Sequence, residues 1–244
     1  MHQPASRFTE IIDVIGPQIT SGDIPTGAVI TLAQIEEKFS CSRTVAREAQ
    51  RHLESCGLII PKRRHGLLVQ PRSQWNVLDP DVIRWRLAGS ESDRQMRSLN
   101  DLRQAIEPKA AHLAAQYASR EERENLLILA DNLTQLGATT SGQEFLEADI
   151  AFHTAILRAS GNEMFCSLSS VIDTVLSWRT NAALMPPHPE PHAMQLHLEV
   201  AQAIAQAQPA RASQAMAAIV AEVQEAFDSH LPHVLRAPQG KTAQ

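Results

Sequence analysis

Apolar residues recur at a helical period along most of the chain, and turn residues divide it into segments. Residues 5–20 show this period first, and a break rich in glycine and proline follows in SGDIPTGAVI. Two short helices, joined by about three residues, are then predicted for TLAQIEEKFS and SRTVAREAQRHLESCG. Thr31 and Ser42 are suited to cap their N-termini, and Gly57 is suited to end the second. These elements predict a helix followed by a helix–turn–helix.

A β-hairpin is predicted after Gly57, because LIIPKRR and LLVQP are apolar runs that flank the dipeptide HG. A helix, a helix–turn–helix and a hairpin in this order form a winged helix–turn–helix, which we place at residues 1–70. Residues 71–80, PRSQWNVLDP, begin and end with proline and are predicted to be a linker.

Residues 81–232 carry helical periodicity, interrupted only by the short breaks SES, TTSG, GN and PPHPEP. About seven helices fit between these breaks, which predicts an all-α antiparallel bundle. The polar tail, residues 233–244, is expected to be disordered. The expected fold class is therefore mainly α, with an N-terminal winged helix–turn–helix and a C-terminal helical bundle.

The composition is that of a soluble globular protein, with 43% hydrophobic and 20% charged residues. No apolar run approaches the roughly 20 residues that span a bilayer, and the N-terminus lacks the features of a signal peptide. Cys41, Cys56 and Cys166 are odd in number and scattered, which argues against a disulfide framework or a cysteine-based zinc site. We therefore expect a cytoplasmic protein with no membrane partner.

Positive charge is concentrated near the N-terminus although the whole chain has a net charge of −5. Residues 1–75 contain nine Lys/Arg and seven Asp/Glu. Arg43, Arg47 and Arg51 lie one turn apart on the second predicted helix of the helix–turn–helix, whose N-terminal residues reach base edges in such modules. Guanidinium groups bind guanine or phosphate through two hydrogen bonds. Arg51 lies farther along, and a phosphate contact and a solvated position are equally consistent with its place.

The predicted hairpin adds further positive side chains at its turn, which can follow phosphates or the minor groove. Alone, each feature also fits a solvated charged face, but their combination favours double-stranded DNA as a partner. The candidate DNA-binding residues are Arg43, Thr44, Arg47, Arg51, Lys62, Arg63, Arg64, His65 and Gly66.

The predicted helix around EADIAFHTAI carries two polar residues on an apolar face. Asp149 and His153 are four residues apart, so their side chains point in the same direction. Their neighbours on that face are mostly apolar, among them Phe152 and Ile156. A carboxylate and an imidazole on a face that should be buried indicate a binding site or a paired structural contact.

The segment SGDIPTGAVITLAQIEEKFSCSRTVAREAQRHLESCGLI resembles the DNA-binding domain of the GntR superfamily of bacterial transcription regulators. The resemblance lies in the SGxxPxG motif, the SRTxxREA helix and the glycine of the wing. The chain departs from the family pattern at Val29–Leu32, where VITL replaces the usual LPSE. The resemblance implies that Arg43, Arg47 and the wing contact operator DNA.

The helical region resembles the effector domain of the FadR subgroup, the FCD domain, over nearly all of residues 80–232. The motifs are LRQAIEPKAAHLAA, DIAFHTAILRASGN and HLEVAQAI. Many FCD domains bind a divalent metal through one Asp and three His, so Asp149, His153 and His197 are implied ligands for zinc, nickel or manganese. Ile219 occupies the expected position of the fourth ligand. There are two alternatives. The three residues bind the effector directly, or a core histidine pairs with Asp149 in a purely structural contact.

The same resemblance implies an effector pocket for a small organic acid. Its candidate residues are Arg103, Asp149, His153, Trp178, Arg179, Asn181 and His197. Arg103 would meet the anionic group, and an ion pair with Glu107 is the alternative. Trp178 is equally consistent with a core position. The segment QWNVLDPDVIRW is similar to the same segment in a sugar-acid regulator of this subgroup, which points to an aldonate-type effector.

The sequence thus predicts a repressor of a sugar-acid catabolic operon, released from its operator when the effector binds. A homodimer is expected because two recognition helices on a pseudo-palindromic site multiply affinity and specificity. An activator, or a regulator responding to another carboxylate metabolite, shares this architecture. A metal-dependent hydrolase is an alternative from another class, but no H-E-x-x-H motif is present. We therefore expect no enzymatic activity.

Overall fold

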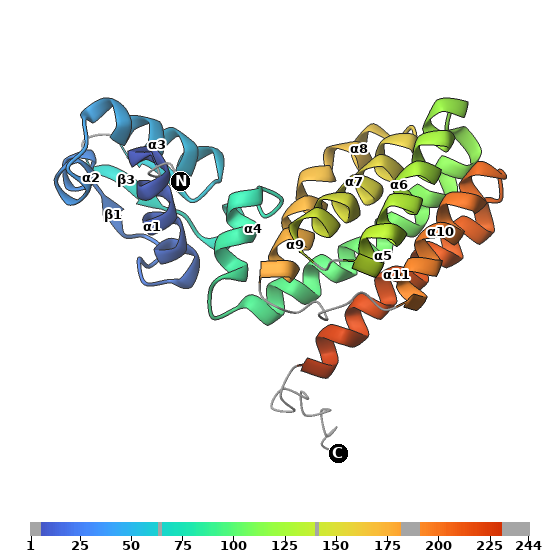
Figure 1. Ribbon diagram of the computed structural model, residues 1–244. Helices are drawn as coiled ribbons and strands as arrows, with labels where there is room; N and C mark the ends of the chain where they lie inside the picture. Colours follow the sequence, from blue (N-terminus) through green and yellow to red (C-terminus); the bar gives the residue numbers. More distant parts are fainter. Residues whose placement is uncertain (1–5, 63–64, 140–141, 182–190, 231–244) are drawn as a thin grey trace, which may run out of the picture. The chain divides into compact units, whose positions relative to one another are not determined.

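The computed structural model describes residues 6–62, 65–139, 142–181 and 191–230 (Figure 1). The chain divides into two compact units, Met1–Leu99 and Asn100–Gln244. The expected disordered tail lies outside the described residues.

The N-terminal unit is built on three helices, α1 (Arg7–Ser21), α2 (Leu32–Phe39) and α3 (Arg43–Ser55). The predicted caps are present, since the side chain of Thr31 accepts a hydrogen bond from the backbone of Gln34, and that of Ser42 from the backbone of Val45. Gly57 follows α3 with φ +72°, in the left-handed region that favours glycine.

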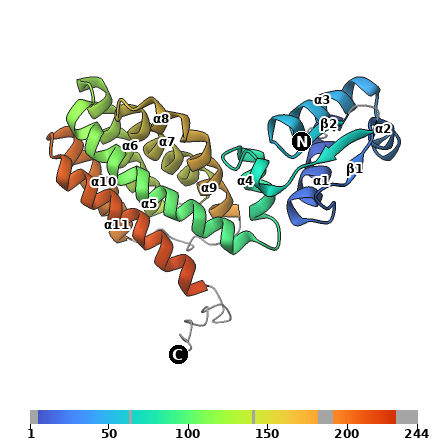
Figure 2. The same cartoon turned by 180° about the vertical axis from the view of Figure 1, so that it is seen from behind.

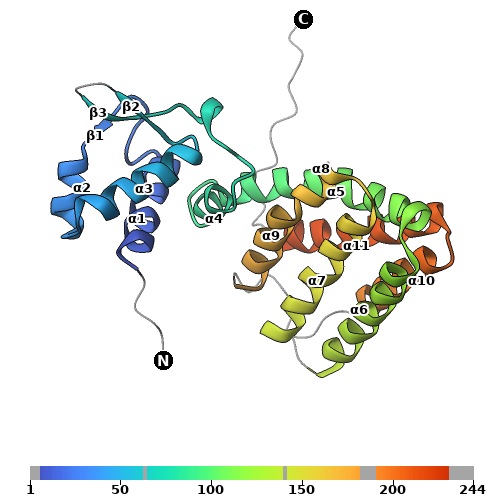
Figure 3. The ribbon, with the colours of Figure 1, turned by 90° about the horizontal axis from the view of Figure 1, so that it is seen from above.

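A three-stranded antiparallel sheet completes this fold, with β1 (Val29–Ile30), β2 (Ile59–Lys62) and β3 (Gly66–Val69) in the order β1-β3-β2 (Figure 3). The hairpin β2–β3 is the predicted wing, with Lys62 opposite Gly66. Strand β1 was not predicted, because two residues show no alternation and their strand character arises only from pairing with β3.

The segment predicted as a linker packs on the N-terminal unit. It contains the 3-10 turn η1 (Arg72–Gln74), and the backbone amide of Asn76 donates to the carbonyl of Cys56. Helix α4 (Pro80–Leu87) follows, and the buried ring of Trp85 lies against Gly16 of α1. Helix α4 therefore belongs to the N-terminal unit, although the sequence pattern predicted it as the first helix of the C-terminal domain.

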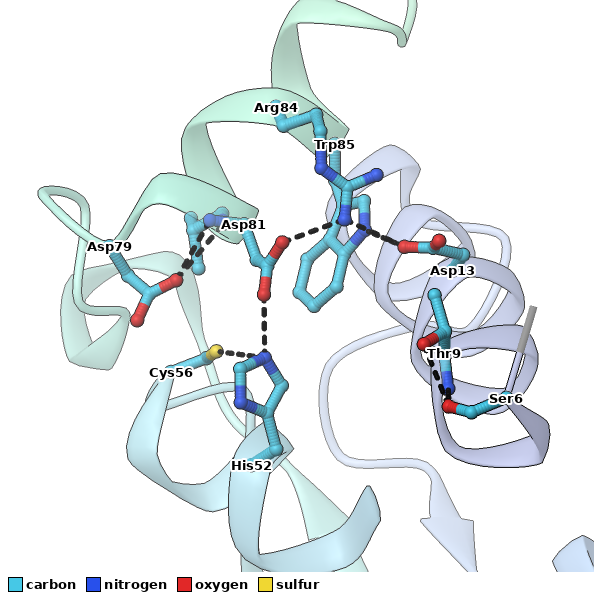
Figure 4. A network of polar contacts seen from close by, with 10 residues as sticks. Ser6, Thr9, Asp13, His52, Cys56, Asp79, Asp81, Arg84 and Trp85 are labelled. Carbon is cyan, nitrogen blue, oxygen red and sulfur yellow. Dashed lines mark hydrogen bonds and ion pairs between the residues drawn. The ribbon is translucent and has the colours of Figure 1, made fainter. Parts of the chain in front are cut away.

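Polar contacts hold α4 to both α1 and α3 (Figure 4). Nε2 of His52 on α3 lies 2.8 Å from Oδ2 of Asp81. The Arg84 guanidinium bridges Oδ1 of Asp81 and Oδ1 of Asp13 on α1, at 2.7 Å from each. These contacts depend on residues far apart in the sequence, which explains why the local pattern around α4 did not indicate its partner.

The described residues of the C-terminal unit form helices joined by short turns. Its helices, the first of which begins in the N-terminal unit, are α5 (Ser92–Tyr117), α6 (Arg120–Thr139), α7 (Gln143–Ala159), α8 (Glu163–Ser167), α9 (Ser169–Asn181), α10 (Pro191–Ala205) and α11 (Pro209–His230).

The helices α9, α7, α6, α10 and α11 are neighbours in that order. Helix α10 contacts both α6 and α11 (Figure 2). Helix α5 contributes Ala110, Ala111, Ala114 and Ala115 to the same core, all with 0% exposure. These small side chains form part of the buried face of α5.

One predicted helix is divided in the structure. The breaks GN and PPHPEP predict one helix in the segment EMFCSLSSVIDTVLSWRTNAAL between them, but α8 ends at Ser167 and α9 begins at Ser169. The hydroxyls of Ser167 and Ser169 donate to the carbonyls of Met164 and Cys166. Such local side-chain bonds compete with the helical backbone pattern and favour a break.

The predicted fold class is confirmed: the structure combines a winged helix–turn–helix with an all-α region. Among the described residues, no helix has the length and apolar character needed to cross a bilayer.

Candidate DNA-binding surface and candidate metal centre

Helix α3 presents its arginines on the side opposite to its packed face. Arg43, Arg47 and Arg51 are exposed, and so is Thr44. Ala46, Ala49 and Leu53 have 0% exposure and attach the helix to the core. Among the described residues, no ion pair involving these three arginines is found. These three arginines, which we call the arginine stripe, are therefore available to a negatively charged partner.

The described residues of the wing also expose potentially positive side chains. Lys62 and His65 are exposed, and the backbone amide of His65 donates to the carbonyl of Lys62 to close the turn. Gly66 has φ +112°, and a Cβ at this position would lie 2.7 Å from the carbonyl oxygen of Ile30. Glycine is therefore required for the hairpin to pair with β1. The other two candidates of the wing, Arg63 and Arg64, lie outside the described residues.

The three predicted metal ligands meet inside the C-terminal unit. Asp149 and His153 come from α7 and His197 from α10, and all three residues are buried. One potential ligand atom from each lies within 4.8 Å of those of the other two. Oδ1 of Asp149 is 3.5 Å from Nε2 of His153 and 3.4 Å from Nε2 of His197. The i,i+4 pair noticed in the sequence is thus completed by a residue from a distant helix.

Both imidazoles are oriented through their other nitrogen. Nδ1 of His153 lies 2.6 Å from Oε2 of Glu107 on α5, and Nδ1 of His197 lies 2.6 Å from the carbonyl oxygen of Ala193. Since both partners can only accept, each Nδ1 carries a proton and donates it. The Nε2 atoms are then directed toward Asp149. A metal-binding histidine is commonly held in this way by a carboxylate or a backbone carbonyl.

Electrostatics in this cluster favour a cation between the imidazoles and Asp149. Burial alone raises the pKa of Asp149, but His153 and His197 outweigh it and hold this pKa well below its usual range. Burial lowers the pKa of His153, while Glu107 and Asp149 outweigh that effect and raise it to about 9. The carboxylate is therefore ionised, and either a proton on His153 or a metal ion supplies the opposing charge.

Arg103 lies next to this cluster and is 1% exposed. Its Nε donates to Oε1 of Glu107 at 2.5 Å. Its two terminal nitrogens are buried and have no hydrogen-bond partner among the described residues. A buried guanidinium with both terminal nitrogens unpaired is a costly arrangement unless an anion completes it.

Glu107 has a second partner that the sequence pattern did not indicate. It was considered only as an ion-pair partner of Arg103, yet it has 0% exposure and joins Arg103 to His153. Burial raises the pKa of its carboxyl, but Arg103 and His153 outweigh this and lower it to about 2. The sequence contains no local signal for the link, because Glu107 and His153 are 46 residues apart.

The structure describes only some of the other residues predicted for the effector pocket and the metal site. Trp178 is half-buried on α9, and the side chains of Arg179 and Asn181 lie outside the described residues. Ile219, at the expected fourth ligand position, is buried in the hydrophobic core. Glu222, one turn farther along α11, lies 3.3 Å from Nε2 of His192. Among the described residues, the candidate metal cluster therefore has three protein ligands.

These three residues fit a divalent transition metal or zinc. Two imidazoles and one carboxylate are ligands that zinc, nickel and manganese accept. Such ions take four or more ligands, so water or a carboxylate from a small molecule would complete the coordination.

Comparisons with known proteins agree with both parts of the chain. The family described as "Bacterial regulatory proteins, gntR family" matches residues 9–69, and the "FCD domain" matches residues 98–222. The galactonate operon transcriptional repressor of Escherichia coli (strain K12) is 32% identical over 189 residues, which cover 74% of this chain and 81% of that protein.

Two further proteins extend the comparison. The Uxu operon regulator of Haemophilus influenzae is 28% identical over 178 residues, covering 72% of this chain and 62% of that protein. The solved structure of E. coli McbR/YncC is 16% identical and aligns with a TM-score of 0.54, covering 92% of this chain and 98% of that one. At this identity the structural likeness concerns the fold alone.

Proposed function

Because the chain belongs to the gntR family of bacterial regulatory proteins and carries an FCD domain, we propose that it is a repressor released from its operator by a small organic acid. The family and these relatives are transcription regulators, not enzymes. The proposal assigns DNA recognition to the N-terminal unit and effector sensing to the C-terminal unit.

For DNA recognition, α3 enters the major groove with Arg43, Thr44 and Arg47 at base edges. Their exposure on one face of a firmly packed helix supports this assignment. Arg51 and the wing residues contact phosphates, which contributes affinity but little sequence discrimination. The protein acts in the cytoplasm, where bacterial DNA is found, and as a homodimer, because two α3 helices are needed to read two half-sites.

For effector sensing, the single observation that carries the proposal is the buried Arg103 with its two unpaired terminal nitrogens. These nitrogens are suited to a carboxylate, which accepts two parallel hydrogen bonds from a guanidinium. Asp149, His153 and His197 would hold a divalent metal, which would offer a second contact to a carboxylate or hydroxyl oxygen of the same molecule. An aldonate carries both groups, and the names of two relatives refer to galactonate and uxu operons.

The effector shifts the protein toward a conformation with lower affinity for DNA, as linkage requires of a ligand that binds the two states differently. The Arg103–Glu107 pair lies on α5, and this helix begins in the N-terminal unit. Helix α5 is thus a continuous covalent connection from the effector site to the DNA-binding unit.

The proposal is tested with a duplex that the protein itself selects from random-sequence DNA. Fluorescence anisotropy measures its binding with and without D-galactonate, D-gluconate, aldarates and short dicarboxylic acids. We expect an aldonate to weaken DNA binding and to raise the melting temperature. A response to dicarboxylic acids alone would contradict the sugar-acid assignment, and increased transcription in vitro from a promoter bearing the duplex would contradict repression.

A further inference from the structure

The carboxylate of Glu107 lies at the centre of a buried chain of three side chains. Oε1 accepts from Nε of Arg103 at 2.5 Å, and Oε2 accepts from Nδ1 of His153 at 2.6 Å. All three side chains are 1% exposed or less. Each oxygen of one carboxylate is therefore committed to a different residue of the proposed effector site.

The contact with His153 decides which ring nitrogen is available to a metal. A neutral imidazole carries one proton, and a carboxylate at Nδ1 holds that proton there. The lone pair then lies on Nε2, which is the atom directed toward Asp149. With the proton on Nε2 instead, His153 could not bind a cation from this position.

The contact with Arg103 decides which face of the guanidinium is available to an anion. Because Nε donates a hydrogen bond to Oε1 of Glu107, the orientation of the guanidinium plane is fixed along that edge. The two terminal nitrogens are left unpaired and buried. An anion that reaches them finds donors already oriented, so it loses less binding free energy to ordering the side chain.

We propose that Glu107 is the positioning residue of the effector site, where it orients the anion-binding guanidinium of Arg103 and the metal-binding imidazole of His153 together. This inference rests on the proposed function, since it presupposes a metal at Asp149, His153 and His197. It extends that function because Glu107, which touches neither the anion nor the metal, sets the orientation of the side chains that bind them.

Glu107→Gln provides a selective test, because an amide offers one acceptor oxygen and one donor group in nearly the same volume. When the oxygen faces Arg103, the NH2 group faces His153 and requires Nδ1 to accept, which moves the proton to Nε2. When the oxygen faces His153, two donors oppose each other at Arg103. Either orientation therefore damages one of the two contacts, and in both the neutral amide replaces the carboxylate charge that makes His153 a stronger metal ligand.

The experiment uses the full chain and Co²⁺ alone, whose visible absorption bands report its coordination. We expect Glu107→Gln to bind Co²⁺ about 10- to 100-fold more weakly than wild type, as found when the partner of a metal-bound histidine is removed. Glu124→Gln is the matched control, because Glu124 forms the same i,i+4 pair with Arg120, at 2.7 Å, on an exposed surface. This control should leave Co²⁺ affinity unchanged.

The outcomes separate this inference from the function on which it rests. Wild-type Co²⁺ affinity in a folded Glu107→Gln variant overturns the positioning role and leaves the metal site intact. A wild-type protein that binds no Co²⁺ overturns the metal site on which the inference rests, and the inference with it. If the variant does not fold, ¹⁵N NMR of the Zn²⁺-loaded wild-type protein decides: metal on Nε2 of His153 with a proton on Nδ1 supports the inference, and metal on Nδ1 overturns it.

Discussion

Oδ2 of Asp81 on α4 lies 2.8 Å from Nε2 of His52 on α3, the proposed recognition helix. This contact, with Trp85 packed on Gly16, attaches α4 to the N-terminal unit. The helix that follows the DNA-binding motif is thus part of the structure that holds α3.

Gly16→Ala should destabilise the N-terminal unit, although the same change inside an exposed helix usually stabilises by about 1 kcal/mol. The added Cβ would lie 2.5 Å from Cδ2 of the buried Trp85 ring, so the ring or the helix must move. We expect a loss of about 1–3 kcal/mol in the free energy of unfolding, measured by chemical denaturation. An increase in stability would show that α4 is not packed on α1 in solution.

Arg47→Ala should abolish specific operator binding and leave the effector response intact. A guanidinium paired to a base contributes about 1–3 kcal/mol of discrimination in each half-site, and the proposed homodimer would lose two such pairs. Anisotropy measures DNA affinity, and thermal denaturation with D-galactonate measures effector binding. Arg120→Ala, which removes an exposed arginine of α6, serves as the control. If Arg47→Ala retains specific binding, α3 is not the helix that reads DNA.

Arg103→Lys should weaken the effector response while keeping the positive charge beside Glu107. A lysine cannot present two parallel donors to a carboxylate, so about 1.5–3 kcal/mol of charge-assisted hydrogen bonding is lost. Calorimetry with D-galactonate is expected to detect roughly tenfold weaker binding or more, since 1.4 kcal/mol corresponds to tenfold. Unchanged affinity would place the carboxylate elsewhere. The DNA affinity of the ligand-free protein should remain that of wild type.

Ile219→His should strengthen metal binding, because it places a third imidazole at the position where relatives of this domain are expected to have a ligand. Ile219 is 4% exposed and lies in the same core cluster as Phe152. Competition of Zn²⁺ with a fluorescent chelator compares the variant with wild type. Ile219→Val, which keeps the apolar character, should bind Zn²⁺ as wild type does. Equal Zn²⁺ affinity in all three proteins would show that a histidine at position 219 does not reach the metal.

Cys56 should resist alkylation at neutral and mildly alkaline pH. Burial, with Asp79 and Asp81 nearby, raises the pKa of its thiol to about 12. Below that pH the thiol stays protonated, and the thiolate is the reactive form. Mass spectrometry after iodoacetamide treatment at pH 8 should find Cys166, which is exposed, modified well before Cys56. Comparable rates for the two would indicate that the segment covering Cys56 opens readily.

Much of this structure could be predicted from the sequence, because local chemistry decides it. The caps at Thr31 and Ser42 bond to amides only three residues away. The arginine stripe of α3 and the Asp149–His153 pair follow from the helical period, so their faces are known before any packing. The resemblance to known families, which the comparisons confirm, added His197 to the candidate site.

The remaining features depend on residues that are distant along the chain, and only the tertiary structure decides them. Strand β1 exists because β3 pairs with it, and α4 joins the N-terminal unit because Gly16 leaves room for Trp85. Glu107 matched the local rule for an ion pair with Arg103, and the rule was correct, but it omitted His153. Sequence periodicity determined which side chains turn inward, and contacts between distant helices, such as that of Glu107 on α5 with His153 on α7, decided which of them meet.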